Sequence, residues 1–484
     1  MHKILPIAHV LSKFIMLFSC MFVFPALVSL YYRDGTLDEF LLSIFAGLAV
    51  GLFLWAATRR YERELKARDG FILVCLMWFG FAVTATTPFM LHFPGMSFTD
   101  ACFEALSTLT TTGATTLTGL DDLPPSINFW RHFLSWLGGM GIIVLAVAVL
   151  PMLGIGGMQL YKAEMPGLIK DNKLAPRIAS TAKSLWIIYT GLTIICTFAL
   201  WIVGMPLFDA ICHAFTTISL GGTSTKDASI GFYNSVAIEM VISFFMVLSA
   251  MNFALHFIAW REGSVRVYFR DTEAKSMLVL LAVSIVGISY YLHHHGVFDF
   301  LTALRHVSFN LISIATACGF ASTDFGAWPT FAPMWILVMS CFTACAGSTG
   351  SGIKMARNLV LIKQTTSEIT RLLHPNAVVP LKINGKILPN QIVLSVLAFV
   401  FVYIASIILL GFIMMISGLD YITAFTAIVA CMNNAGPGLG EVGPASNYSG
   451  LNDFQTWICS LTMVLGRLEI FTLLILLTPT FWRK

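Results

Sequence analysis

Four short segments of this 484-residue chain place small, hydroxylated or amide side chains directly before a glycine. Each segment follows a moderately apolar stretch that is too short to cross a membrane. The stretches cover residues 100–111, 208–219, 300–317 and 421–433. The segments that follow them are Thr111-Thr112-Gly113, Leu220-Gly221-Gly222, Ala317-Cys318-Gly319 and Asn434-Ala435-Gly436. Successive glycines lie 109, 97 and 117 residues apart, and such a period over most of a chain indicates an architectural repeat.

These segments have the chemistry needed to bind a dehydrated cation. A half-helix aimed into a membrane presents its partly negative C-terminal end to the centre, and the carbonyl oxygens that follow can replace the water shell of an ion. Glycine permits backbone angles that other residues avoid. We expect Asp or Thr to cap the outer ends of the half-helices. Asp100, Asp209, His306 and Thr423 each lie 13 residues before a glycine, and Asp299 and Asp420 lie slightly upstream of the last two. Simple packing glycines are the alternative, and the fourfold recurrence argues against them.

The elements that must hold these segments are long apolar runs. The chain is 57% apolar and 11% charged, whereas soluble domains are about 45–50% apolar and about 25% charged. This composition excludes a soluble enzyme and a disordered chain, and a net charge of +4 excludes an ordinary nucleic-acid binder. Runs long enough to span lie near 5–30, 40–58, 71–92, 129–153, 184–206, 233–260, 276–292, 331–363, 391–417 and 454–481.

The sequence therefore predicts an all-α polytopic membrane protein with ten transmembrane helices. Four helix pairs carry re-entrant pore loops, in pseudo-fourfold span–loop–span repeats around one central pore. The predicted units are two additional N-terminal helices at 1–70 and pore repeats at 71–158, 183–262, 275–363 and 391–484. Of the 29 Lys and Arg residues, 24 fall in loops on one side of the predicted spans and four on the other, which predicts that both termini are cytoplasmic.

The eighth span is interrupted by six small residues, Gly347, Ser348, Thr349, Gly350, Ser351 and Gly352. Three glycines within six residues disfavour a helix, and unwound backbone in a membrane must line a cavity or be buried in protein. We interpret this segment as a mobile loop below the filter that blocks the ion path. A simple kink is the alternative.

Two of the charged residues inside predicted spans bear on function. Arg467 is in the last span, where a buried cation is costly and indicates a functional role. Pairing with Glu469 is not expected, because residues two apart point to different faces of a helix. We expect Arg467 to face the pore beside the 347–352 loop and to bias the gate towards the closed state. Glu239 in the sixth span is either a buried structural partner or a pore-lining residue.

Four joined span–loop–span units with one glycine per loop resemble the Trk/Ktr/HKT potassium transporter superfamily. The two leading helices and the runs Thr111-Thr112-Gly113-Ala114-Thr115 and Trp136-Leu137-Gly138-Gly139-Met140-Gly141 are most similar to its bacterial TrkH-type subunits. The resemblance implies potassium-selective uptake across the bacterial inner membrane by channel-like permeation. The four segments would form the filter, and the 347–352 loop with Arg467 would form the gate. In plant relatives Ser at the first glycine position accompanies sodium transport, so Gly113 points to potassium.

The resemblance also implies partners for the chain. TrkH-type subunits form homodimers in membrane lipid and bind a cytosolic, nucleotide-binding regulatory subunit of the TrkA type, for which the segments 159–183 and 363–390 are the candidate contacts. Potassium is the implied cargo, and the sequence contains no motif for an organic cofactor or a catalytic centre. A proton- or sodium-coupled potassium symporter with alternating access is the alternative mechanism.

Overall fold

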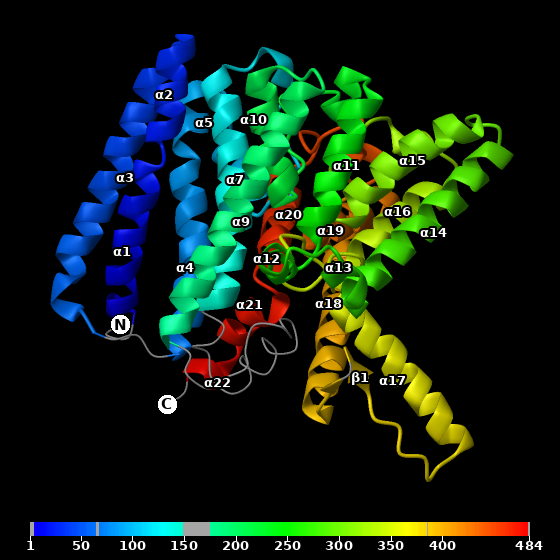
Figure 1. Cartoon of the computed structure of the whole chain (residues 1–484). Coiled ribbons are helices and arrows are strands. Elements are labelled where there is room, and N and C mark those ends of the chain that lie inside the picture. Colours follow the sequence, from blue (N-terminus) through cyan, green and yellow to red (C-terminus); the bar gives the residue numbers. More distant parts are fainter. Residues whose placement is uncertain (1–3, 64–66, 149–174, 385, 483–484) are drawn as a thin grey trace.

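The computed structural model describes residues 4–63, 67–148, 175–384 and 386–482, and these are predominantly helical (Figure 1). Six helices in this part of the chain are long and apolar enough to cross a membrane, and the number rises to eight if each of two bent helix pairs is one span. Further apolar helices of 12 to 16 residues accompany them. The chain is thus a polytopic membrane protein, and the number of ten spans stays a prediction.

A helical layer at the N-terminus covers one edge of the molecule (Figure 1). It comprises α1 (Leu5–Cys20), α2 (Val23–Tyr32) and α3 (Leu37–Thr58), which pack on α4 (Ala67–Ala85) and α7 (Pro125–Ala148). Phe22, Phe40 and Trp130 are fully buried between these helices. Burial of such large aromatic side chains provides much of the packing energy where the first helices meet the rest of the chain.

Four short helices lie among the longer ones, and each occupies an equivalent place in the chain. They are α6 (Phe98–Leu109), α10 (Leu207–Ser219), α15 (Phe300–Ala315) and α19 (Tyr421–Asn433), within two residues of the stretches identified in the sequence. The helices that precede or follow them are α4, α5 (Thr87–His92), α7, α9 (Ala175–Ile202), α11 (Val236–Ala250), α14 (Thr272–His294), α16 (Phe331–Phe342), α18 (Asn390–Ile416) and α20 (Asp453–Arg467). Each short helix is largely buried by these neighbours.

The caps of the short helices agree with the prediction only at the two upstream aspartates, Asp299 and Asp420. The side chains that cap are Ser97, Asp299 and Asp420, and α10 has no side-chain cap. Asp100 and Asp209 lie in the first turn, and the N–H of Thr423 donates to Asp420. The expectation that Asp100, Asp209 and Thr423 are caps was therefore wrong. A capping residue has extended backbone and must precede the first helical turn, so the capping position lies upstream of these three residues.

Three predicted spans are broken rather than one. The eighth is interrupted between α16 and α17 (Met355–Leu373), as the glycines indicated. The sixth bends by 98° between α11 and α12 (Phe253–Glu262), and the tenth by 111° between α20 and α21 (Ile470–Leu477). Continuous helices over 233–260 and 454–481 were thus wrong predictions. Asn252 caps a new helix by accepting from the N–H of Ala254, and Glu469 has a left-handed φ of 53°.

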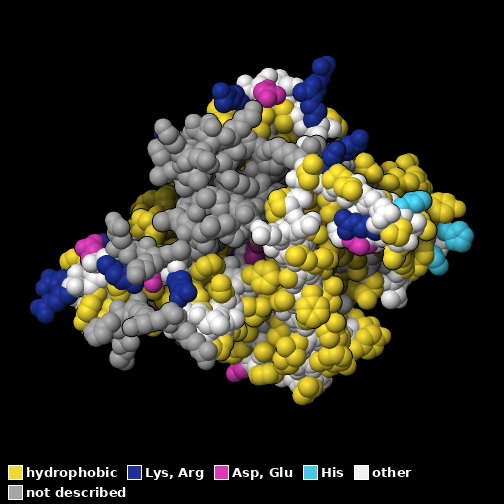
Figure 2. Space-filling view, turned by 90° about the horizontal axis from the view of Figure 1, so that it is seen from below, with side chains coloured by type: hydrophobic (Ala, Val, Ile, Leu, Met, Phe, Trp, Pro, Cys, Tyr) yellow, Lys and Arg dark blue, Asp and Glu magenta, His cyan; other side chains and the backbone are white. Residues whose placement is uncertain are grey.

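One end of the molecule carries a projection formed by α17 and α18, with the strands β1 (Lys382–Ile383) and β2 (Lys386–Ile387) between them (Figure 1). Helix α1 begins and α22 (Pro479–Trp482) ends at this same end. Figure 2 views this end directly, with Lys and Arg side chains on it and apolar side chains along the flanks. Most of the predicted loop 159–183 lies outside the described residues.

Candidate functional site

The four short helices end in the same backbone turn. A residue one or two positions after each helix has a positive, left-handed φ, namely Thr111 (φ 57°), Leu220 (55°), Ala317 (61°) and Asn434 (52°). The next N–H donates to the carbonyl oxygen five residues earlier, in the pairs Thr112–Ser107 (2.7 Å), Gly221–Thr216 (2.8 Å), Cys318–Ser313 (2.8 Å) and Ala435–Ala430 (2.9 Å). This Schellman-type turn partners the last helical carbonyls and reverses the chain. A glycine with positive φ follows in all four segments.

The four loops touch one another around a closed ring. A β-carbon added at each glycine would meet the carbonyl oxygen of the neighbouring loop, in the pairs Gly113–Gly221, Gly222–Cys318, Gly319–Ala435 and Gly436–Thr112. The fourth loop thereby closes on the first. Eight of the twelve residues of the predicted filter segments take part in these four close approaches, and the other four directly precede them in the chain. Any side chain at the glycine positions would force neighbouring backbones apart, because they approach too closely for a β-carbon.

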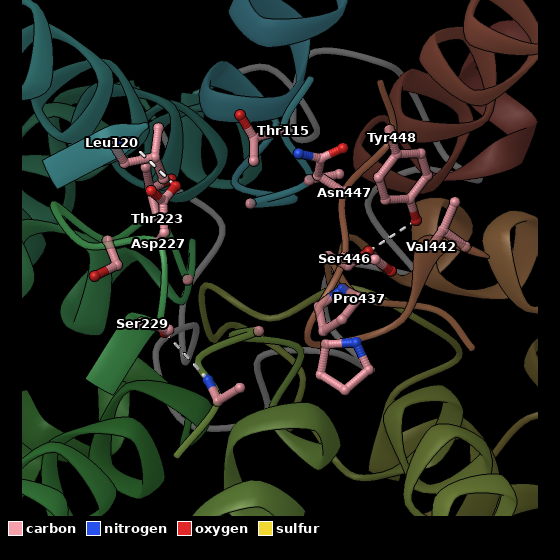
Figure 3. A pocket seen from close by; sticks show the side chains of 18 of the residues that line it. Thr115, Leu120, Thr223, Asp227, Ser229, Pro437, Val442, Ser446, Asn447 and Tyr448 are labelled. Atoms are coloured by element: carbon pink, nitrogen blue, oxygen red, sulfur yellow. Dashed lines mark hydrogen bonds between the residues drawn. The ribbon is translucent and has the colours of Figure 1, made fainter. Parts of the chain in front are cut away.

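A cavity of about 90 Å³ opens on the side of the residues that follow the glycines (Figure 3). All four glycines line it, together with small polar side chains that follow the first, second and fourth segments in the chain. Among its described lining residues Asp227 is the single carboxylate, and Arg131 and Lys226 also contribute. Any attraction of a cation here must come chiefly from backbone carbonyl and hydroxyl oxygens.

The 347–352 loop lies against the opposite side of the ring, at the ends of the short helices. The hydroxyl of Thr349 donates to the carbonyl oxygen of Ile218 in the last turn of α10, at 3.2 Å. A β-carbon at Gly350 would lie 3.1 Å from the carbonyl oxygen of Thr316, at the end of α15. One at Gly352 would lie 3.1 Å from the side-chain oxygen of Asn433, at the end of α19. The loop therefore occupies the space directly behind the ring.

Arg467, the last residue of α20, binds this loop and is only 2% exposed. One of its terminal nitrogens donates to the carbonyl oxygen of Thr349 at 2.9 Å and lies 3.5 Å from the hydroxyl of Ser351. The other donates to the carbonyl oxygen of Gly138 at 3.1 Å. These partners are uncharged, and the structure records no ion pair for Arg467 among the described residues. Its positive charge is therefore not neutralised by a carboxylate beside the loop.

Glu469 serves different partners. Its carboxylate pairs with Lys354 at 3.2 Å and with Arg357 at 2.7 Å, at the point where the loop ends and α17 begins. The guanidinium of Arg357 also stacks over the ring of Phe399 at 4.0 Å. The break in the tenth span is thus joined by ion pairs to the break in the eighth span.

The Gly138-Gly139 pair explains how α7 approaches the ring. A β-carbon at Gly138 would collide with the carbonyl oxygen of Leu109, at the end of α6. One at Gly139 would lie 2.6 Å from the β-carbon of Ser219, at the end of α10. The two glycines let α7 pack directly against two of the four helix ends, which places the carbonyl of Gly138 within reach of Arg467.

Sequence reasoning missed Tyr448 beside the fourth loop, and it named Asn434 without its side-chain contact to the first loop. The hydroxyl of Tyr448 donates to the carbonyl oxygen of Gly436 at 2.9 Å, and its N–H donates to that of Thr115 at 2.9 Å. The side-chain amide of Asn434 donates to the hydroxyl of Thr112, also at 2.9 Å. Both join the fourth loop to the first. An aromatic residue within the Gly-, Ser- and Asn-rich segment 443–452 was the available signal for Tyr448.

Glu239 is a structural partner of a neighbouring helix. Its carboxylate forms a two-point ion pair with Arg305, with distances of 2.6 and 3.0 Å, which links α11 to α15.

At the start of α19 the hydrogen bonds from Thr423 hold the pKa of Asp420 below its usual value. An ionised carboxylate at that place also favours the helix, because it interacts with the partly positive N-terminus.

Several known proteins are similar to this chain over nearly its whole length. Residues 37–484 match the family TrkH, described as a cation transport protein. The chain is 46% identical over 480 residues to the Trk system potassium uptake protein TrkH of Salmonella typhimurium, and 45% identical over 480 residues to that of Escherichia coli K12, with 99% of each chain covered. It also matches the crystal structure of the potassium transporter TrkH from Vibrio parahaemolyticus, with a TM-score of 0.91 and 43% identity, over 99% of this chain and 100% of the other.

Proposed function

Because the chain belongs to the TrkH family of cation transport proteins, we propose that it takes up potassium by channel-like permeation through the ring of four loops. Several of its relatives are named potassium uptake proteins, and they match the whole length of the chain. The observation that carries the proposal is the closed ring itself, in which each glycine abuts a carbonyl oxygen of the next loop. Carbonyl oxygens from four loops can replace the hydration shell of a potassium ion.

The residues of the filter are those of the four segments that form the ring. They are Thr111, Thr112, Gly113, Leu220, Gly221, Gly222, Ala317, Cys318, Gly319, Asn434, Ala435 and Gly436. The C-terminal ends of four helices meet there, so their partial negative charges add to the attraction for a cation. Binding therefore needs no carboxylate in the ring, in agreement with the nearly carboxylate-free lining of the adjoining cavity.

The gate of the proposed pore is the loop Gly347–Gly352 held by Arg467. The loop lies behind the ring and blocks the straight path of an ion, and the uncompensated charge of Arg467 raises the barrier for cations beside it. Opening requires the loop to leave the ends of α10, α15 and α19. The helices α17 and α18, which project beyond the rest of the molecule, are the levers through which a cytosolic subunit acts on this loop (Figure 1).

The wider arrangement follows from the same proposal. The chain crosses the bacterial inner membrane ten times with both termini in the cytoplasm, as the distribution of Lys and Arg predicts. It works as a homodimer with a nucleotide-binding regulatory subunit of the TrkA type. The names of the relatives as parts of a Trk system support the involvement of further components.

Growth of a potassium-uptake-deficient bacterium tests the function. The intact chain, expressed with its regulatory partner, should restore growth at low potassium, and the Gly113→Ser variant should restore it less well and admit more sodium. Failure of the intact chain to restore growth would contradict the proposal. Rapid downhill flux into liposomes without a proton or sodium gradient separates channel-like permeation from coupled symport, because a symporter needs its second ion.

A further inference from the structure

A buried ion pair lies next to the first loop of the ring, on the side of the cavity. Glu104 on α6 is 0% exposed and Arg131 on α7 is 2% exposed, and the Nε of Arg131 donates to the carboxylate at 2.7 Å. Removing two charges from water is costly, so a buried pair is not in general a source of stability. We therefore look for the role of this pair in the residues to which it is hydrogen-bonded.

The pair holds the residues 114–116, which follow Gly113 in the first loop and are here called the limb. The second carboxylate oxygen of Glu104 accepts from the hydroxyl of Thr115 at 2.8 Å and from the N–H of Thr116 at 3.4 Å. Arg131 donates to the same hydroxyl at 3.3 Å. Thr115 lies two residues after the glycine, so both charges act on backbone that is continuous with the ring.

The same anchor recurs in two other loops, nine residues before the glycine. His213 lies 2.9 Å from the hydroxyl of Ser224, two residues after Gly222. Asn310 forms two hydrogen bonds with Ser322, from its amide to the hydroxyl at 2.9 Å and from the N–H of Ser322 to its carbonyl oxygen at 3.1 Å. A polar residue nine positions before the glycine recurs in three loops, although its side chain differs. This indicates a shared role, which is to hold the residues that follow the glycine in place.

The fourth loop lacks this anchor and obtains another. The equivalent residue is Ala427, and in its place the hydroxyl of Tyr448 binds the glycine carbonyl from the other side. The N–H of Tyr448 also donates to the carbonyl oxygen of Thr115. The limb of the first loop, which Glu104 and Arg131 hold, is therefore also hydrogen-bonded to the fourth loop.

We propose that Glu104 is a positioning residue for ion selectivity, which holds the first loop through Thr115 at the spacing that suits potassium rather than sodium. The proposal rests on the potassium-uptake function proposed above. Selective coordination depends on where the carbonyl oxygens lie and how far they move. The charge-assisted hydrogen bonds of a buried carboxylate are stronger than neutral ones, so they restrict that movement most. Arg131 orients the carboxylate through the ion pair, and Glu104 pairs with a cation that would otherwise face the adjoining cavity without a partner.

The test compares two neighbouring threonines in the full chain reconstituted in liposomes. Thr115→Val removes the hydroxyl that joins the ion pair to the limb, and both charged residues remain. Thr116→Val is the matched control, because the Thr116 hydroxyl has no hydrogen-bond partner within the described structure. The readout is the potassium-to-sodium preference, measured as rubidium tracer uptake competed by either ion. We expect Thr115→Val to lower this preference about tenfold, which corresponds to about 1.4 kcal/mol, and Thr116→Val to leave it unchanged.

A second variant keeps the inference open to refutation if Thr115→Val folds poorly. Glu104→Gln retains the shape of the side chain but leaves the charge of Arg131 uncompensated, so it should lower both the preference and the total uptake. Thermal unfolding of each purified variant separates a general loss of structure from a specific change in selectivity. A Thr115→Val protein that folds and keeps the preference of the wild type overturns the inference. A wild-type chain without potassium-selective uptake overturns the proposed function, and this inference with it.

Discussion

The Arg467 contacts predict how strongly the 347–352 loop is held closed. Arg467 donates to the carbonyl oxygens of Thr349 and Gly138 at 2.9 and 3.1 Å. Charge-assisted hydrogen bonds contribute about 1.5–3 kcal/mol each. If the Arg467→Ala change removes both from the closed state alone, the closed state loses at least about 3 kcal/mol. Every 1.4 kcal/mol is a factor of ten, so the ratio of the open to the closed state rises by at least about a hundredfold.

The assay is tracer uptake into liposomes that contain the purified chain without its regulatory partner, where the closed state should dominate. Arg467→Ala should raise the initial rate at least about tenfold, because at least one of the two hydrogen bonds is lost from the closed state. Arg467→Lys is the matched control. It keeps the positive charge but can reach only one carbonyl at a time, since an ammonium lacks the planar fork of a guanidinium.

The comparison of the two variants separates two causes. If the hydrogen bonds hold the gate, Arg467→Lys should show an intermediate rate. If the charge alone forms the barrier, Arg467→Lys should behave as the wild type does. An unchanged or lower rate in Arg467→Ala, with the protein still folded by size-exclusion chromatography, would refute the assignment of this residue to the gate.

Three further predictions concern the ring and its support. Gly222→Ala should abolish selective uptake, because its β-carbon would collide with the neighbouring loop. Gly119→Ala is the control and should change uptake little, because Gly119 has a similar positive φ but open space around it. A Gly222→Ala protein with normal selectivity would contradict the close approach of the loops. Tyr448→Phe removes one hydroxyl donor of about 1 kcal/mol, so it should lower the potassium-to-sodium preference about fivefold in the same tracer assay. Glu469→Gln removes two ion pairs of largely buried side chains, which join the ends of two broken spans, and should lower the unfolding temperature. Glu368→Gln on α17 breaks an exposed pair worth about 0–1 kcal/mol and should change the unfolding temperature little. Equal unfolding temperatures would show that the Glu469 pairs do not stabilise the fold.

The sequence predicted the short helices well because their signals are local. An apolar stretch of about a dozen residues that ends in small residues and glycine leaves few other structures inside a membrane. The bounds of α19 agree to the residue with the stretch 421–433. The interruption near Gly350 was found for the same reason, since several glycines in one span cannot be overlooked.

The contacts that support the ring could not be predicted in this way, because they join residues far apart in the chain. Arg131 was counted as a charge of an outer loop, yet it is buried and paired with a glutamate 27 residues earlier. The bends at Asn252 and Glu469 contain neither glycine nor proline, so their runs looked continuous. In both cases tertiary packing outweighs the local preference for one long helix. Counting nine positions back from each glycine would have brought Glu104 to notice.

The ring belongs to a single polypeptide, and this changes how it can vary. In a pore built from identical subunits one substitution alters every side of the opening at once, as symmetry requires. Here Glu104, His213, Asn310 and Ala427 occupy equivalent places and have become four different residues. Each quadrant can therefore be altered alone, in evolution and at the bench. A single substitution changes one of the four loops around the opening, and the other three loops stay unmodified for comparison.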